Sequence, residues 1–408
     1  MLELRLASRN IWRHSRRTWL TVGAMVFSNI LLVFMIGLQF DTYQLMIDNT
    51  LRVFTGHIQL QAPGYLDEPG IRKTLPDIQA LAEDVRANIS GVDVSARATG
   101  FALASSEERS YGIQVVGVQP QYEAKVSTLA GLITAGRYLQ QGDTNATVIG
   151  KILARNLKIG VGEELTILGS GRDGSMAADV LTVVGIFESN MPEMDRSLAL
   201  MPLERFQNVF FMEGRGHTVV IRAGEFSLVD SKAAQLRQRY GAAANRVVLH
   251  WDELKPGLRQ AIQADMASAW FMYAVLIVLV AFSVMNTQLM SVLERTREFG
   301  MIMALGLRPG RLVRLVLLET AVIASIGLLL GVLLGGGLNL VLSHTGFAYP
   351  GMEEMAQRFN LPNRIFPEVT LFTVLLGPGI VFAASMLASL YPALRVKFLQ
   401  PIAAMKAV

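Results

Sequence analysis

The side chains able to do chemistry in this 408-residue sequence form no catalytic set. The histidines are far apart, and none has a second histidine or cysteine at metal-site spacing: His14, His57, His217, His250 and His344. The sequence has no cysteine, which excludes thiol catalysis, disulfides and cysteine metal ligation. The Gly150-Lys151 pair lacks the upstream glycine and following Ser/Thr of a phosphate loop. We therefore expect no catalytic residue, metal site, cofactor site or nucleotide site in this chain.

The charges that do stand out lie in residues 292–311, between two apolar runs. Five arginines, two glutamates and three glycines fall within or beside this segment, with apolar residues placed among them. The pattern predicts a short amphipathic helix at a membrane face. Two interpretations are open: a basic helix held on anionic lipid, or a contact for another protein.

The position of this segment in the protein depends on the apolar runs that precede and follow it. The sequence is 51% hydrophobic and 17% charged, with a mean hydropathy of +0.38, which is typical of a membrane protein. About 20 apolar residues in a helix cross a hydrocarbon core of roughly 30 Å. Four segments meet this requirement and predict four transmembrane helices: residues 18–40, 269–291, 312–342 and 366–391.

Charge asymmetry predicts the orientation. Arginine and lysine are concentrated in three short flanks, residues 1–17, 292–311 and 392–408, which should be cytoplasmic. Residues 41–268 hold 22 Lys+Arg and 26 Asp+Glu and should lie outside the cytoplasm, as should the short loop 343–365. The sequence pI near 9.3 therefore reflects topology, and we expect membrane lipids and no nucleic acid as partners.

The long segment 41–268 mixes strand-like and helix-like patterns, which predicts a large α+β domain inserted between the first two membrane helices. We expect two lobes, at about 41–130 plus 226–268 and at 131–225. The expected strands are 57–61, 112–118, 165–168, 181–186 and 218–221. The expected helices are 78–85, 151–157, 203–210 and 228–239.

Two loops of this domain are candidate contacts for a partner or cargo. Residues 165–187 predict a hairpin with the tip GSGRDGSMAAD, which carries Arg172 and Met176. The loop ESNMPEMDR carries Met191 and Met194, whose flexible side chains suit an apolar partner. The alternative is that both methionines simply pack against their own domain.

The third apolar segment has two unusual features. Gly327, Gly331 and Gly335 recur every fourth residue and predict a face for close helix packing, either within the chain or with a second copy. Glu319 lies inside the same segment, where an acid is costly. Because Arg311 and Arg314 lie about two turns away, we expect a local partner for Glu319.

The stretch LERTREFGMIMALGLRPGRLVRLVLLE resembles the cytoplasmic loop of ABC transporter permeases of the MacB, LolC/LolE and FtsX type. The resemblance continues in ASRNIWRHSRRTWLT, in GRYLQQGDTNATVIGKILARNLKIGVGEELTI and in ASLYPALRVKFLQPIAAMK, and so covers nearly the whole chain. It implies a multi-pass protein of the bacterial inner membrane with both termini in the cytoplasm.

The resemblance also implies roles and partners. The loop would dock on a separate ABC ATPase, present in two copies, which binds the ATP and magnesium. Its coupling residues would be Glu294, Arg295, Arg297, Glu298, Gly300, Ala304, Gly306 and Arg308. The permease would pair with a second copy or a paralogue. Residues Trp251 to Gln263 would form a stalk into the second membrane helix.

Three functions compete within the family. A LolC/LolE-like machine extracts lipoproteins or other lipid-anchored cargo and passes them to a periplasmic carrier. A MacB-like machine expels peptides or drugs through an adaptor and an outer-membrane duct, and an FtsX-like one regulates a cell-wall hydrolase.

Since the chain starts almost at its first membrane helix, the ATPase is expected on another polypeptide, as in the LolC/LolE-like machine. The short, proline-free hairpin tip departs from LolC and favours a LolE-like role or a different cargo. Outside the family, a membrane sensor without transport would have no need of the loop.

Overall fold

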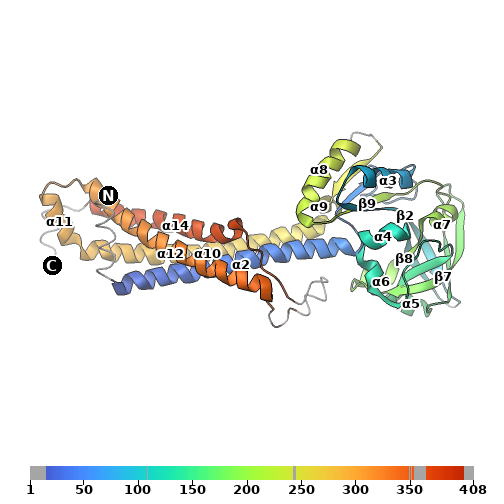
Figure 1. Ribbon diagram of the computed structural model, residues 1–408, viewed down its shortest axis with the longest axis horizontal. Coiled ribbons are helices and arrows are strands. Elements are labelled where there is room, and N and C mark those ends of the chain that lie inside the picture. Colours follow the sequence, from blue (N-terminus) through green and yellow to red (C-terminus); the bar gives the residue numbers. More distant parts are fainter. Residues whose placement is uncertain are drawn as a thin grey trace. The chain divides into compact units, whose positions relative to one another are not determined.

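The computed structural model describes residues 15–107, 109–241, 245–348, 350, 352 and 364–398. The chain divides into two compact units, which are described separately (Figure 1). The helical unit draws on Met1–Tyr43, Ala261–Tyr349 and Asn363–Val408, and the sheet unit on Gln44–Gln260 and Pro350–Pro362. Residues 1–14 of the expected N-terminal flank, most of the loop 343–365 and residues 399–408 of the expected tail lie outside the described residues.

Four helices of the described residues are long and apolar enough to cross a membrane: α2 (Ser15–Val53), α10 (Pro256–Glu294), α12 (Pro309–Thr345) and α14 (Leu371–Lys397). The helices α2, α10 and α12 each contain a predicted span. The fourth predicted span, 366–391, begins too early, because residues 366–370 are not helical and α14 starts at Leu371. The helices α2 and α10, with 39 residues each, are about 58 Å long at helical rise. That length exceeds the roughly 30 Å of a hydrocarbon core, so both helices continue beyond their apolar segments.

The three regularly spaced glycines lie on the face of α12 that packs against α2 of the same chain. A Cβ added at Gly327 would lie 3.0 Å from the Cβ of Met25, and one at Gly331 would lie 2.4 Å from the Cβ of Asn29. The Asn29 amide donates to the carbonyl oxygen of Gly327 at 3.1 Å, which the close approach of the two helices permits. Gly335 meets Ile30 and Val33 in the same way.

Replacing Gly331 with alanine should therefore destabilise the helical unit, because the new methyl group overlaps Asn29. We expect a cost of about 1 to 3 kcal/mol, typical of overpacking. Gly337 is the matched control, since nothing lies within 4 Å of an added Cβ there; Gly337→Ala should be neutral or stabilising through helix propensity. The measurement is the apparent melting temperature of the purified chain in detergent. Equal melting temperatures for the two variants would contradict the packing described.

Polar contacts join α2 and α10 at two levels of the helical unit. At one level the Arg17 side chain pairs with Glu294 at 3.2 Å, and the hydroxyls of Thr21 and Thr287 are 3.0 Å apart. At the other, the Tyr273 hydroxyl donates to Gln39 at 2.7 Å, and Tyr43 donates to Asp265. An apolar cluster that includes Val22, Met25, Leu32, Val280 and Val284 fills the space between.

The sheet unit is built on ten strands of one continuous sheet, in the order β10-β1-β9-β2-β3-β8-β5-β7-β4, with β6 pairing with β2 and β7. The strands are β1 (Ile58–Gln61), β2 (Val92–Ser105), β3 (Ser110–Val118), β4 (Ile133–Gly136), β5 (Ala146–Gly150), β6 (Glu164–Ser170), β7 (Met176–Phe187), β8 (Leu198–Pro202), β9 (Thr218–Ala223) and β10 (Val247–His250). The helices are α3 (Ile78–Asn88), α4 (Pro120–Val126), α5 (Lys151–Leu157), α6 (Pro192–Ser197), α7 (Leu203–Val209), α8 (Val229–Tyr240) and α9 (Trp251–Leu254), with short 3₁₀ turns at Thr128–Leu132 and Phe226–Leu228.

The predicted α+β character of this unit is confirmed. Every strand and helix predicted for it is present, within a few residues of its expected bounds. The strands β2, β4, β5, β8 and β10 were not predicted. In β5 and β8 all five residues are buried, so the sequence lacks the alternation that marks a half-exposed strand. The division into two lobes stays a prediction.

One prediction for this unit is wrong. The hairpin tip is shorter than expected, because Ser170 already pairs with Met176, which leaves residues 171–175 as the turn.

The segment expected as a stalk, Trp251 to Gln263, is divided between α9 and α10, and its part from Pro256 onward continues into the second membrane helix. The division falls at Lys255, because Pro256 has no N–H to donate and disfavours a helical conformation at the residue before it.

Candidate functional site

The segment between the second and third membrane helices folds into the predicted short helix, α11 (Thr296–Ala304). Arg295 is its N-cap residue, directly after the end of α10. Gly306 ends the helix with a φ of 96°, a left-handed conformation that suits glycine. Pro309 then starts α12, where its missing N–H costs no hydrogen bond. These residues therefore fix a helix of defined length between two sharp corners.

One face of α11 packs against the ends of the membrane helices. Phe299 is fully buried in a cluster with Val292 of α10, Leu312 and Val316 of α12, and Ala393 and Val396 of α14. Gly300, beside it, is buried as well. This packing attaches α11 to three helices at once, so α11 has a fixed position on the helical unit.

The Arg295 side chain reinforces this attachment. Its Nη1 lies 2.8 and 3.0 Å from the two carboxylate oxygens of Glu319 in α12. Its Nε lies 3.5 Å from Glu298, and its guanidinium carbon lies 4.9 Å from the centre of the Phe299 ring. Glu319 thus has the local partner that we expected, although the partner is Arg295 and not Arg311 or Arg314.

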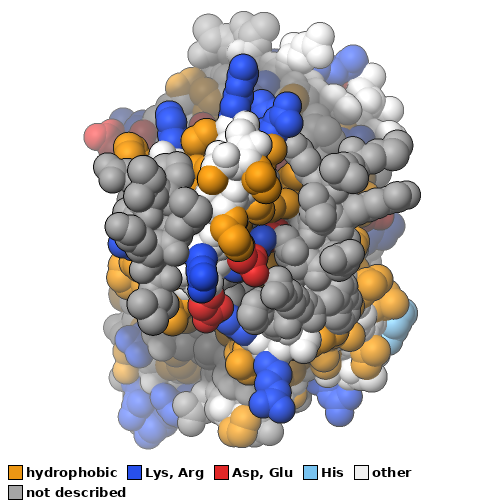
Figure 2. Space-filling view, turned by 90° about the vertical axis from the view of Figure 1, so that its left-hand side faces the viewer, with side chains coloured by type: hydrophobic (Ala, Val, Ile, Leu, Met, Phe, Trp, Pro, Cys, Tyr) orange, Lys and Arg blue, Asp and Glu red, His pale blue; other side chains and the backbone are white. Residues whose placement is uncertain are grey.

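The opposite face of α11 is apolar and exposed. Leu305 is 89% exposed and Met301 48% exposed, and Ile302 is exposed beside them. Figure 2 faces the side on which α11 lies in Figure 1, and hydrophobic side chains there lie among Lys, Arg, Asp and Glu side chains. We call Met301, Ile302 and Leu305 the α11 docking face. An apolar face rimmed by charge is the usual anatomy of a protein contact.

The predicted coupling residues divide into two groups. Those with exposed or partly exposed side chains are Glu294, Arg297, Glu298, Ala304, Gly306 and Arg308. Arg295 and Gly300 instead face the chain itself, so a bulky residue at Gly300 would first disturb this chain's own packing. The three residues of the docking face were not predicted, although their placement at i, i+1 and i+4 among charges was visible in the sequence.

The candidate contacts in the sheet unit are also divided. Met176, at the start of β7, is 72% exposed, and Arg172 lies partly exposed in the hairpin turn. Met191 and Met194 are half-buried against a cluster that includes Val116, Phe187 and Leu198. They therefore lie as the alternative interpretation expected, packed against their own domain.

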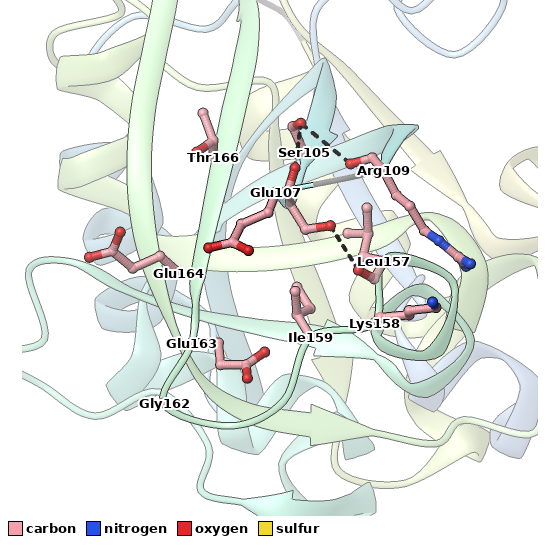
Figure 3. A pocket seen from close by; sticks show the side chains of 11 residues that line it. Ser105, Glu107, Arg109, Leu157, Lys158, Ile159, Gly162, Glu163, Glu164 and Thr166 are labelled. Atoms are coloured by element: carbon pink, nitrogen blue, oxygen red, sulfur yellow. Dashed lines mark hydrogen bonds between the residues drawn. The ribbon is translucent and has the colours of Figure 1, made fainter.

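A cavity of about 670 Å³ in the sheet unit lies among the β2–β3 turn, the end of α5 and the start of β6. Figure 3 shows its charged side chains pointing in different directions, with Glu107, Glu163 and Glu164 on one side and Arg109 and Lys158 on the other. Ser106 donates to the carbonyl of Leu157 at 2.8 Å, so its hydroxyl has a structural role. These groups do not converge on one point as a catalytic set would.

Two histidines of the sheet unit also have structural contacts. The ring of His217 stacks on Tyr65 and accepts the Thr99 N–H at 2.8 Å. Burial lowers the pKa of His217 to about 4, so its ring is neutral at physiological pH. His57 contacts Asp48 at 2.9 Å. Among the described residues no group of three or more His, Cys, Asp or Glu side chains has the arrangement of a metal site.

Comparison with protein families assigns both units. Residues 18–239 match the family of MacB-like periplasmic core domains, and residues 270–401 match the FtsX-like permease C-terminal family. The first match alone covers more than half of the chain. The second contains α11, α12, α14 and most of α10.

Individual relatives agree with these matches. The lipoprotein-releasing system transmembrane protein LolC of Xylella fastidiosa is 27% identical over 314 residues, which cover 73% of this chain and 74% of the relative. The corresponding LolE of Haemophilus influenzae is 22% identical and covers 90% and 89% of the two chains. The macrolide export ATP-binding/permease protein MacB of Bdellovibrio bacteriovorus is 26% identical, covering 72% of this chain but 46% of the relative. The described residues include four helices long and apolar enough to cross a membrane, with a periplasmic-type domain between the first two. This chain belongs to the MacB/LolC/LolE/FtsX family of ABC transporter permeases, which are multi-pass proteins of the bacterial inner membrane.

Proposed function

We propose that ATPase subunits dock on the α11 docking face and that ATP-driven movement of α11 is passed through the membrane helices to the sheet unit. The observation that carries this proposal is the construction of α11. Its inner face is fixed on α10, α12 and α14, while its apolar outer face is exposed among charges. A helix that only lay on lipid would gain nothing from such firm attachment to three other helices.

The assembly would contain two ATPase subunits and a second permease, either another copy of this chain or a paralogue. ATP and magnesium would be bound by the ATPase subunits, and this chain alone would not hydrolyse ATP. Both termini and α11 would lie in the cytoplasm, as the arginine asymmetry predicts, and the sheet unit would lie in the periplasm. We also retain the two-lobe division of the sheet unit, at about 41–130 plus 226–268 and at 131–225, as part of this proposal.

The cargo that we propose is a lipoprotein or another lipid-anchored molecule, taken from the outer leaflet of the inner membrane and passed to a periplasmic carrier. Two observations support this choice. The relatives named LolC and LolE match this chain over most of their length. The sheet unit also exposes apolar side chains on neighbouring strands, where Leu103 pairs with Leu168 and Phe101 is exposed nearby. Such a face suits a carrier or cargo with apolar groups.

A second candidate function is MacB-like export of peptides or drugs through an adaptor and an outer-membrane duct. The match of residues 18–239 to the MacB-like periplasmic core domain favours it. An FtsX-like role, the regulation of a cell-wall hydrolase, remains a third candidate on the match of residues 270–401.

The cargo can be tested with the chain and its co-purified partners in proteoliposomes. We expect ATP to release a triacylated test protein into the soluble fraction when a carrier is present, and to leave the same protein without its acyl chains unaffected. The matched control is the chain without its partners, which should neither hydrolyse ATP nor release cargo. Equal movement of the acylated and unacylated proteins would favour the MacB-like function, and ATP hydrolysis by the chain alone would contradict the proposed division of labour.

A further inference from the structure

Arg295 occupies the corner between α10 and α11. Its N–H donates to Ser291 in the last turn of α10 at 3.3 Å, and its carbonyl accepts the Phe299 N–H in the first turn of α11 at 2.9 Å. The backbone of this one residue therefore belongs to both helices. Any rotation of α11 relative to α10 must take place at or beside Arg295.

The side chain of Arg295 extends this junction to a third helix. It contacts both carboxylate oxygens of Glu319, and the Glu319 side chain is only 5% exposed. Glu319 lies ten residues after Pro309, or about 15 Å along α12 at helical rise. The pair therefore holds α12 at a position well inside the helix.

Stability alone does not account for a buried ion pair at this place. The cluster around Phe299 already holds α11 on α12, and apolar residues of similar volume often stabilise as well as a buried pair does. What the pair adds is a fixed geometry. One guanidinium nitrogen, Nη1, lies within hydrogen-bond distance of both carboxylate oxygens. Such a charge-assisted hydrogen bond is directional and strong in a low-dielectric site, so it resists separation of the two groups, whereas apolar surfaces can slide past one another.

We infer that the Arg295–Glu319 pair is the joint through which displacement of α11 is transmitted to α12. This inference rests on the proposed function, in which ATPase subunits push or pull on α11. It makes Arg295 and Glu319 positioning residues that act after docking, and it removes Arg295 from the set of direct ATPase contacts. Loss of the pair should uncouple ATP hydrolysis from cargo movement while docking persists.

The test uses the full complex in proteoliposomes and measures three quantities: ATPase co-purification, ATP hydrolysis, and cargo released per ATP. The main variant is the double replacement Arg295→Met/Glu319→Gln, which removes both charges and leaves neither one buried alone. We expect normal co-purification and hydrolysis, with cargo per ATP reduced roughly 5- to 150-fold, the range typical of a lost coupling between sites. Glu319→Asp and Arg295→Lys keep the charges and should restore part of the coupling.

The matched control is Arg311→Met/Arg314→Met, which removes two exposed arginines from the first turns of α12 and should leave cargo per ATP unchanged. Wild-type cargo release per ATP in the double neutral variant would overturn the inference, as would loss of ATPase binding in that variant, because the pair would then serve docking. Failure of the proposed function is distinguishable, since the unmodified complex would itself show no ATP-dependent cargo movement.

Discussion

Replacing Met301 and Leu305 with lysine should weaken ATPase binding strongly without unfolding the chain. Both side chains belong to the exposed α11 docking face, so their removal takes no apolar group out of this chain's core. Lysine is a good helix former, and near the C-terminal end of α11 it is favoured by the helix dipole. Loss of two apolar anchors from the centre of a contact typically costs about 2 to 4 kcal/mol, or roughly 30- to 900-fold in affinity.

The measurement is the dissociation constant of the ATPase for the purified chain in nanodiscs. Leu228→Lys is the control, because Leu228 is comparably exposed in the sheet unit and should not affect ATPase binding. The variant also separates the two interpretations of α11. If the helix only lay on anionic lipid, the two lysines would change its contact with lipid and leave its ATPase affinity unaffected. Unchanged ATPase affinity and unchanged transport would then contradict docking at this face.

The existence of α11 was predictable, while the direction in which its residues face was not. The spacing of apolar and charged residues indicates an amphipathic helix, and the glycine and proline that follow mark its end. The burial of Phe299 and Gly300 depends on the ends of α10, α12 and α14 meeting at one place. These are tertiary contacts between segments about 100 residues apart in the sequence, and a local sequence pattern does not predict them.

The same limit explains the partner of Glu319. Sequence distance favoured Arg311 and Arg314, which precede it on α12 by roughly two turns. On a helix, however, residues eight or five positions apart do not share the face that those three or four apart share. The corner at Arg295 brings a more distant arginine to the correct face. The four membrane helices, in contrast, needed only composition and length for their prediction.

The longest unpredicted strand, β2, shows why the sheet was only partly visible in the sequence. Its residues VDVSARATGFALAS include many small side chains, which have a weak strand preference. They are nevertheless central to the sheet, because β2 pairs with β3, β6 and β9. The small residues leave room for Phe206 and Phe210, which lie within 3.5 Å of a Cβ added at Gly100.

The other large effect that we expect is a loss of stability when a buried ion pair of β2 is broken. Arg97 of β2 and Glu123 of α4 are 3% and 0% exposed, and the Arg97 Nε lies 3.1 Å from the Glu123 carboxylate. Arg97 also donates to the carbonyl oxygen of Phe54 at 2.6 Å and lies over the Phe54 ring. Phe54 directly follows Val53, the last residue of α2. Through these two contacts with Phe54, Arg97 connects the end of α2 to a central strand of the sheet unit.

Arg97→Met should leave the Glu123 charge buried without its partner, at a cost of about 3 to 5 kcal/mol. For a unit of this size we expect the apparent melting temperature to fall by roughly 6 to 20 °C. The double variant Arg97→Met/Glu123→Leu should recover most of this loss, because two apolar side chains can replace a buried pair at little cost. Thermal unfolding of the purified chain, followed by circular dichroism, measures both effects.

The double variant also separates stability from force transmission. It lacks the hydrogen bond to the Phe54 carbonyl and the cation over the Phe54 ring. The end of α2 then keeps the packing of Val53 and the contact between Asp48 and His57. If α2 moves the sheet unit, we expect cargo released per ATP to fall several-fold in a chain whose melting temperature is nearly normal. Arg222, whose guanidinium lies 3.9 Å from the exposed Asp93, provides the control: Arg222→Met removes an arginine from the neighbouring strand without touching α2. Normal cargo release by the stabilised double variant would mean that Arg97 serves the fold alone, and that α2 drives the sheet unit through its remaining contacts.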